Sequence, residues 1–203
     1  IIGKPFNDSV FIVTATTNTA AAQIHGDTVH SVAGLRRKLA NILRNLTTNW
    51  KVAKILFIDE ISMLDIKDFI KLDKYLRHLM AQFNIDAINY PFGGLNIVLV
   101  GDFSQLNPIG KNLIYDQILN VLWSEINRVV ILNMKNHRFS QDPNWGKILE
   151  RMHHGKSTPA DIEIINTRVV GENLSLPSFE ELQGNDITYA CATNAERNVV
   201  SDN

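Results

Sequence analysis

The stretch Ile55-Leu56-Phe57-Ile58-Asp59-Glu60 joins a run of four apolar residues directly to two adjacent carboxylates. A short, continuously apolar run of this kind is typical of a buried strand in a parallel sheet. In open parallel sheets, ligands bind beyond the carboxyl ends of the strands. The stretch therefore predicts a central strand that delivers Asp59 and Glu60 to such an edge.

Other segments share this pattern and are expected to be strands of the same kind. They are residues 10–14, 96–100, 129–132 and 187–191. Apolar residues at helical spacing lie between them. The helices expected from this spacing are 20–24, 32–46, 66–83, 114–123 and 145–152. Alternation of strands and helices predicts an α/β fold, with a parallel sheet, right-handed crossovers and helices on both faces of the sheet.

The composition excludes several classes of protein. The 203 residues are 45% hydrophobic and 20% charged, which rules out general disorder and allows one large domain or two small ones. The single cysteine, Cys191, rules out a disulfide-built scaffold. No apolar run approaches the roughly 20 residues that a membrane helix needs, so no membrane partner is expected. We expect an intracellular protein.

The net charge is −1, which gives no support to a constitutive nucleic-acid binder of the histone type. The distribution of charge is more informative, because residues 35–54 contain basic side chains and no acid. These are Arg36, Arg37, Lys38, Arg44, Lys51 and Lys54. The run is either a solvated helix face or a local patch that faces phosphates, and the sequence leaves both interpretations open.

Polar residues that follow the expected strands are suited to phosphoryl chemistry. Of the pair Asp59-Glu60, one carboxylate can hold Mg²⁺, usually through water, and the other can orient or deprotonate an attacking water. Gln105, which closes Gly101-Asp102-Phe103-Ser104-Gln105, can contact a terminal phosphate. Arg138, beyond the strand expected at 129–132, can stabilise charge on a transferring phosphoryl group. Taken singly, each has a plainer interpretation: a helix-start acid pair, a polar loop and a surface arginine.

Taken in order, these segments resemble the motifs of Pif-type DNA helicases of superfamily one, over nearly the whole chain. The segments that carry the resemblance are 14–21 with 28–31, 59–63, 92–94 with 101–108, 136–138, 149–155 and 189–194. The chain departs from the usual pattern at three positions. Thr16 stands where proline is usual, Asn18 where glycine is usual, and Asn107 where the first of two prolines is usual.

The resemblance implies a RecA-like P-loop NTPase fold, with most of a first motor domain at 1–132 and the beginning of a second at 133–203. It implies an ATP-dependent DNA helicase that moves 5′→3′ on single-stranded DNA, with ATP as substrate and Mg²⁺ as cofactor. DNA repair, recombination and telomere maintenance are compatible pathways. The compartment implied is the nucleus or mitochondrion in a eukaryote and otherwise the cytoplasm.

The same resemblance implies roles by position. Asp59 would hold Mg²⁺, Glu60 would activate water, Gln105 would sense the γ-phosphate, and Arg138 would be an arginine finger from the second motor domain. A further group would lie near single-stranded DNA: Thr14, Thr17, Asn18 and His30.

One expected motif is missing from the chain. No Gly-x-x-x-x-Gly-Lys-Ser/Thr is present, and Gly3-Lys4 is followed by Pro5 instead of a hydroxyl residue. We therefore expect the phosphate-binding loop to lie upstream of Ile1, and the 203-residue chain to be inactive alone. The alternative hypothesis is a catalytically inactive, helicase-derived module that binds nucleic acid or protein. The sequence does not predict an oligomeric state.

Overall fold

The computed structural model describes residues 10–38, 48–105, 108, 113–114, 121–132, 139–169, 191 and 195. The chain divides into two compact units, Ile1–Ile131 and Leu132–Asn203. Within the described residues, the first unit contains a parallel sheet and the second contains two helices. The assignment of two motor domains to these parts of the chain stays a prediction.

Four parallel strands form the sheet, in the order β2-β1-β3-β4. Their bounds are Phe11–Ala15 for β1, Asp27–Thr28 for β2, Ile55–Asp59 for β3 and Asn96–Leu99 for β4. Ile58 of β3 pairs with Thr14 on one side and Leu99 on the other, so the three longer strands end at the same edge. The strands predicted at 10–14, 55–58 and 96–100 are confirmed.

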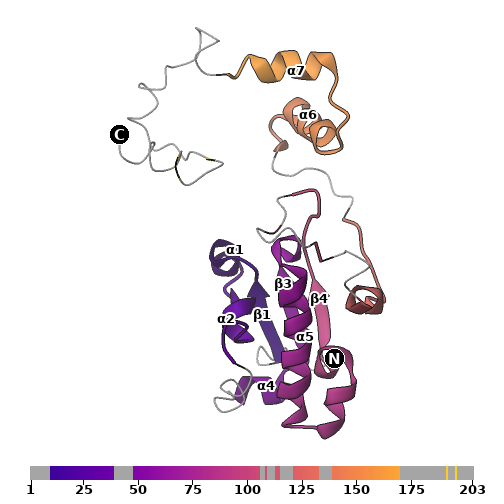
Figure 1. The fold of residues 1–203 in the computed structure, drawn as a ribbon. Helices are drawn as coiled ribbons and strands as arrows, with labels where there is room; N and C mark the ends of the chain where they lie inside the picture. Colours follow the sequence, from indigo (N-terminus) through magenta and orange to yellow (C-terminus); the bar gives the residue numbers. More distant parts are fainter. Residues whose placement is uncertain are drawn as a thin grey trace, which may run out of the picture. The chain divides into compact units, whose positions relative to one another are not determined.

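The long helix α5, Ile66–Ala81, lies along the sheet (Figure 1). Its buried side chains Phe69, Leu72 and Leu76 recur at helical spacing and pack into one cluster with Leu56 and Ile58 of β3. Full burial of each such side chain contributes about 1.5–3 kcal/mol. The helix therefore covers and holds one face of the sheet whose edge carries the strand ends.

The connection from α5 to β4 passes through two 3-10 segments, η3 (Ile85–Asn89) and η4 (Pro91–Gly94). Buried Asp73 of α5 accepts hydrogen bonds from the backbone N–H of Phe92, at 2.6 Å, and from Nε of Arg77, at 2.7 Å. Gly93 has φ 66°, and a Cβ there would lie 2.6 Å from the carbonyl oxygen of Leu76. Only glycine fits this position, and the turn sets where β4 begins.

The two faces of β4 are not equally covered. Ile97 and Leu99 pack against the hydrophobic core on one face, whereas Val98, on the other face, is 41% exposed. The expectation that the strands are covered on both faces therefore does not hold at this strand, within the described residues. The apolar run at 96–100 forms a strand because it pairs with β3, although one side of it faces outward.

The helix expected at 32–46 differs from the structure. The short helix α2, Val29–Val32, ends because Gly34 adopts φ 63° and the backbone N–H of Leu35 closes the turn onto the carbonyl of His30, at 3.0 Å. Residues 33–38 are turns and irregular backbone, and 39–47 lie outside the described residues. A left-handed glycine is a common helix end, and here it overrides the apolar spacing.

The strand expected at 129–132 is also not formed. Its four side chains are 71–78% exposed, and no described strand pairs with it. An apolar run becomes a strand only where a neighbour satisfies its backbone hydrogen bonds. The helix expected at 114–123 and the strand expected at 187–191 lie mostly outside the described residues.

The remaining elements of the first unit are short. They are α1 (Asn18–Gln23), α4 (Thr48–Val52), η2 (Ile61–Met63) and η5 (Val121–Glu125). No helix in the described ranges is long and apolar enough to cross a membrane.

In the second unit, an ion pair between Arg151, whose side chain is 39% exposed, and buried Asp161 joins α6 (Pro143–His153) to α7 (Pro159–Asn166). The guanidinium of Arg151 donates two hydrogen bonds to the carboxylate of Asp161, which also forms a capping box with Thr158 at the start of α7. The hydrogen bonds from Arg151 have the largest effect on the Asp161 carboxyl, and those from Thr158 add to it. Together they hold the pKa of this carboxyl far below its usual range. The helix predicted at 145–152 is confirmed as part of α6.

Candidate active site

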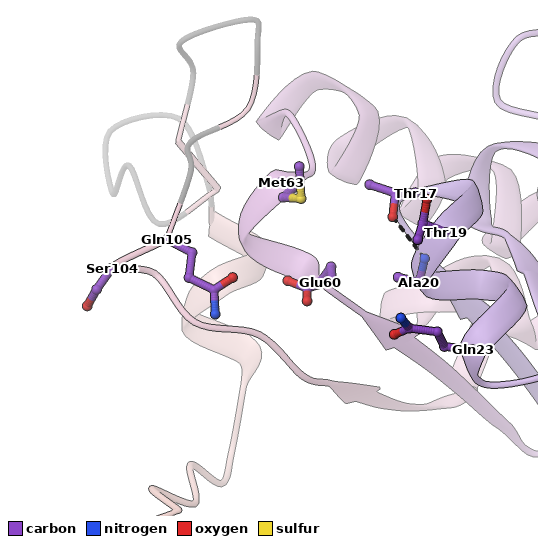
Figure 2. A pocket seen from close by; sticks show the side chains of 8 residues that line it. All are labelled: Thr17, Thr19, Ala20, Gln23, Glu60, Met63, Ser104 and Gln105. Carbon is purple, nitrogen blue, oxygen red and sulfur yellow. Dashed lines mark hydrogen bonds between the residues drawn. The ribbon is translucent and has the colours of Figure 1, made fainter. Parts of the chain in front are cut away.

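A cavity of about 680 Å³ opens beyond the carboxyl ends of β1 and β3 (Figure 2). Its lining comes from three places in the sequence: the segment after β1, the turn after β3 and the turn after β4. The lining residues are Thr17, Thr19, Ala20, Gln23, Glu60, Met63, Ser104 and Gln105. The topology therefore brings together the ends of three strands, as parallel sheets do at their ligand-binding edge.

Glu60 follows the last residue of β3 in a left-handed conformation, with φ 54° and ψ 40°. For a residue with a side chain, this conformation costs roughly 1–2 kcal/mol. The carboxylate Oδ1 of Asp59 accepts the backbone N–H of Glu60 at 2.9 Å and so stabilises the turn. Figure 2 shows the Glu60 side chain between Gln105 on one side and Gln23 with Thr17 on the other. Strain retained at such a position is typical of a functional residue.

Hydrogen bonds from both neighbouring strands hold the turn at Glu60. From the β1 side, Thr16 donates its backbone N–H to the carbonyl of Asp59 at 3.1 Å and its Oγ1 hydrogen to the carbonyl of Glu60 at 2.9 Å. From the β4 side, the carbonyl of Val100 accepts the N–H of Ile61 at 3.0 Å. The backbone of the turn that carries Glu60 is therefore held by hydrogen bonds on both sides.

Asp102 positions the side chain of Gln105. The carboxylate of Asp102 accepts the N–H of Ser104 at 2.9 Å and Nε2 of Gln105 at 3.3 Å. A Cβ at Gly101 would lie 3.0–3.2 Å from atoms of Ile61 and Ser62, so the absence of a side chain lets the β4 end approach the β3 turn. As expected from the sequence, Glu60 and Gln105 line the same cavity at one edge of the sheet.

The residues expected near single-stranded DNA fall into different environments. Thr17 lines the main cavity and caps α1 by accepting the N–H of Ala20 at 3.2 Å. Asn18, with Thr28 and Ser31, lines a second cavity of about 260 Å³. His30 lies on α2, where its Nε2 is 3.0 Å from Oδ2 of Asp68 on α5.

Thr14, which was expected near single-stranded DNA, is buried and has no side-chain surface available to a ligand. It is 0% exposed, and its Oγ1 donates to the carbonyl of Phe57 at 2.8 Å. A buried hydroxyl needs an internal partner, and this one finds it across the β1–β3 ladder. The side chain therefore fastens two strands together. Arg138 lies outside the described residues, so its expected role stays a prediction.

Sequence reasoning did not single out Thr19 and Gln23, which also line the cavity. The signal was available, because residues four apart on a helix share one face and α1 follows directly after a strand end.

Asp59 is suited to help hold a magnesium ion, but not to hold one alone. The described residues contain no cluster of three or more His, Cys, Asp or Glu that could bind a metal. Mg²⁺ is commonly bound by one or two carboxylates together with phosphate oxygens and water. The donor set at Asp59 therefore fits an ion that arrives with a phosphate ligand.

Comparison with known proteins places this geometry in a family. The model for PIF1-like helicases matches residues 4–154. The chain belongs to the PIF1-like helicase family. The RecA-like α/β fold expected from the sequence is thereby confirmed, together with the parallel sheet and flanking helices observed in the structure.

Curated members of this family match a large part of the chain. The ATP-dependent DNA helicase RRM3 of Saccharomyces cerevisiae is 34% identical over 159 residues, covering 72% of this chain and 21% of the relative. The ATP-dependent DNA helicase PIF7 of Trypanosoma brucei brucei is 29% identical over 192 residues, covering 86% of this chain and 18% of the relative. The chain thus spans about a fifth of the length of these family members.

Solved structures of PIF1-like helicases share the fold. The crystal structure of Pif1 helicase from Candida albicans has a TM-score of 0.64 and 28% identity, covering 80% of this chain and 38% of that one. Pif1 from Bacteroides, in complex with ADP-AlF3 and single-stranded DNA, has a TM-score of 0.70 and 19% identity, covering 99% of this chain and 48% of that one. The Bacteroides likeness supports the fold alone.

Proposed function

We propose that the protein carrying this sequence is an ATP-dependent DNA helicase, and that the cavity at the carboxyl edge of the sheet takes the terminal phosphates of ATP. The observation that carries the proposal is the placement of Glu60 and Gln105, from two neighbouring strand ends, in one cavity. A carboxylate and an amide that converge in this way can orient an attacking water and contact a phosphate oxygen.

The proposed roles follow from position. Glu60 orients or deprotonates the attacking water, and Gln105, held by Asp102, contacts the γ-phosphate and couples it to movement. Asp59 contributes to Mg²⁺ binding together with phosphate oxygens, and the ion supplies charge neutralisation at the phosphates. Arg138 acts as an arginine finger. The sequence contains no Gly-x-x-x-x-Gly-Lys-Ser/Thr, so tight ATP binding needs a phosphate-binding loop beyond the 203 residues.

Single-stranded DNA is the proposed polymer substrate, with 5′→3′ movement. Support comes from the family and from the polar residues of the second cavity, Asn18, Thr28 and Ser31, which lie beside the residues that line the main cavity in α1. Thr14 is left out of the proposed contacts because it is buried. Roles in DNA repair, recombination or telomere maintenance rest on the family resemblance.

The substitution Glu60→Gln in the full-length protein tests the proposal. It removes the negative charge and keeps the size of the side chain, so ATP hydrolysis at saturating single-stranded DNA should fall roughly 10²–10⁴-fold while nucleotide binding is retained. Glu125→Gln, at an exposed acid of the same unit, is the matched control. An unchanged hydrolysis rate in Glu60→Gln would rule out the role given to Glu60. A wild-type protein that binds DNA but does not hydrolyse ATP would favour the inactive interaction module.

A further inference from the structure

One side of α5 carries a row of basic side chains. Lys67, Lys71, Lys74 and His78 follow one another at intervals of four, three and four residues, which places them in a single row along the helix. The acids of α5 are engaged elsewhere. Asp68 lies 3.0 Å from Nε2 of His30, and Asp73 is buried against Arg77 and Phe92.

The segment 35–38 is fastened beside this row. Nζ of Lys71 donates a hydrogen bond to the carbonyl of Leu35, and the hydroxyl of Tyr75 donates to the carbonyl of Arg37 at 2.7 Å. Leu35 is 1% exposed and anchors the segment in the core. Because these contacts use the backbone of the segment, the side chains of Arg36, Arg37 and Lys38 are left exposed.

The charges brought together here are not balanced by internal pairing. Among the residues that the structure describes, the ion pairs are Arg77–Asp73 and Arg151–Asp161, and Asp68 forms a hydrogen bond with His30. None of them includes the five cations that we call the basic surface: Arg36, Arg37, Lys38, Lys67 and Lys74. Since the whole chain has a net charge of −1, this surface is a local concentration of positive charge.

We propose that the basic surface binds the sugar–phosphate backbone of DNA, as a contact additional to the cavities at the carboxyl edge. The inference rests on the proposed function, because it assigns a second part of the DNA contact to the same protein. Lys67 and Lys74 lie two helical turns apart on α5, about 10.5 Å along the axis, beside the three cations of the anchored segment, and such a spread of separate positive charges suits a polymer with regularly spaced phosphates. Long flexible lysines and exposed arginines bind phosphates without reading bases, so the contact is expected to be independent of sequence.

For the first three cations of the basic run, Arg36, Arg37 and Lys38, this arrangement favours the phosphate-facing interpretation over a solvated helix face. A solvated helix face needs no backbone anchor, whereas here Lys71 and Tyr75 hold the segment and present its three cations next to Lys67 and Lys74. Preorganisation of exposed cations reduces the ordering that a bound polymer must impose on them.

The test neutralises three cations at once in the full-length protein, with Arg36→Gln, Arg37→Gln and Lys74→Gln. Binding is measured without nucleotide, for single-stranded and for duplex DNA, at salt concentrations from about 50 to 200 mM. Each lost phosphate contact should lower the slope of log K against log salt by about 0.7 for a single strand or 0.9 for a duplex. We expect a slope smaller by about 2 and an affinity roughly tenfold lower for the form of DNA that occupies the surface.

Two controls make the result specific. Lys51→Gln, Lys54→Gln and Arg128→Gln together remove the same charge from exposed positions elsewhere in the unit and should leave the slope unchanged. Arg36→Lys, Arg37→Lys and Lys74→Arg together keep the charge and should restore the slope. The inference is overturned if the slope is unchanged for both forms of DNA, or if the first control loses as much slope as the test variant. It is also overturned if the test variant keeps its DNA binding and loses only its binding to a poly-glutamate peptide, because the surface would then be a site for acidic protein. DNA binding is measured without nucleotide, so the result does not depend on the role given to Glu60. The basic surface can therefore be confirmed or rejected even if Glu60→Gln leaves ATP hydrolysis unchanged.

Discussion

Oγ1 of Thr16 donates a hydrogen bond of 2.9 Å to the backbone carbonyl of Glu60. The backbone N–H of Thr16 donates to the neighbouring carbonyl of Asp59 at 3.1 Å. Proline, which is usual at this position in the resembling helicases, has neither a hydroxyl nor an N–H and could form neither bond. This chain therefore connects the segment that begins α1 directly to the strained turn that carries the Glu60 carboxylate.

The hydroxyl of Thr16 should matter for both stability and turnover. Thr16→Val keeps the branched shape and removes the donor, so it should lower the free energy of unfolding by about 0.5–1.5 kcal/mol and slow ATP hydrolysis severalfold, with little change in KM. Thr16→Ser, which keeps the donor, is the matched control. Denaturant titration and steady-state hydrolysis by the full-length protein measure the two effects. Equal behaviour of the valine and serine variants would show that the bond does not position Glu60.

The left-handed backbone at Glu60 gives a prediction that separates strain from chemistry. Glu60→Ala and Glu60→Gly both remove the carboxylate, but only glycine adopts φ 54° without penalty. The glycine variant should therefore be more stable than the alanine variant by about 1 kcal/mol, although both should be inactive. Urea unfolding midpoints of the two variants provide the comparison. A glycine variant no more stable than alanine would indicate that the turn relaxes on substitution.

Gly93 should tolerate no side chain. Gly93→Ala combines a left-handed φ of 66° with a Cβ 2.6 Å from the Leu76 carbonyl and 2.7 Å from Met80, so the free energy of unfolding should fall by roughly 2 kcal/mol or more. Its neighbour is the matched control, because Gly94 has φ 77° and its nearest contact for a Cβ is 3.9 Å away. Gly94→Ala should lose only about 1 kcal/mol. Similar losses in the two variants would contradict the packing argument at Leu76.

The strand ends could be predicted from the sequence because an apolar run and a polar cluster meet there. A buried parallel strand shows as an apolar run, and the polar residues that follow it stand out against that run. Asp59, Glu60 and Gln105 were found in this way. Such a pattern does not show which way a side chain points at the end of a strand. Thr14 was expected near single-stranded DNA from the family resemblance, whereas its hydroxyl donates to the carbonyl of Phe57 inside the sheet.

Other parts of the fold depend on partners that local sequence does not reveal. The apolar run at 129–132 matches a strand in composition, yet strand formation depends on a neighbour for the backbone. The helix expected at 32–46 was extended past Gly34 because apolar spacing continued, whereas the backbone at that glycine turns left-handed. Thr16 was noted only as a departure from a family pattern, since its two bonds to the β3 end are contacts across more than forty residues of sequence.

The second unit should lose stability in acid through one carboxylate. Hydrogen bonds from Arg151, and then from Thr158, hold the pKa of Asp161 far below the value of about 3.9 expected in an unfolded chain. Between these two pKa values the unfolded state binds the proton and the folded state does not. The contribution of the ion pair is therefore complete above the unfolded pKa and is lost as pH falls below it towards the folded pKa. Hydrogen-exchange protection of α6 and α7, corrected for intrinsic rates, should decline from about pH 5 to pH 2. Asp161→Asn should start less protected and lose most of this decline. Asp142→Asn, which replaces the α6 N-cap with another good capping residue, should keep it. An undiminished acid-dependent decline in Asp161→Asn would assign the effect to other groups.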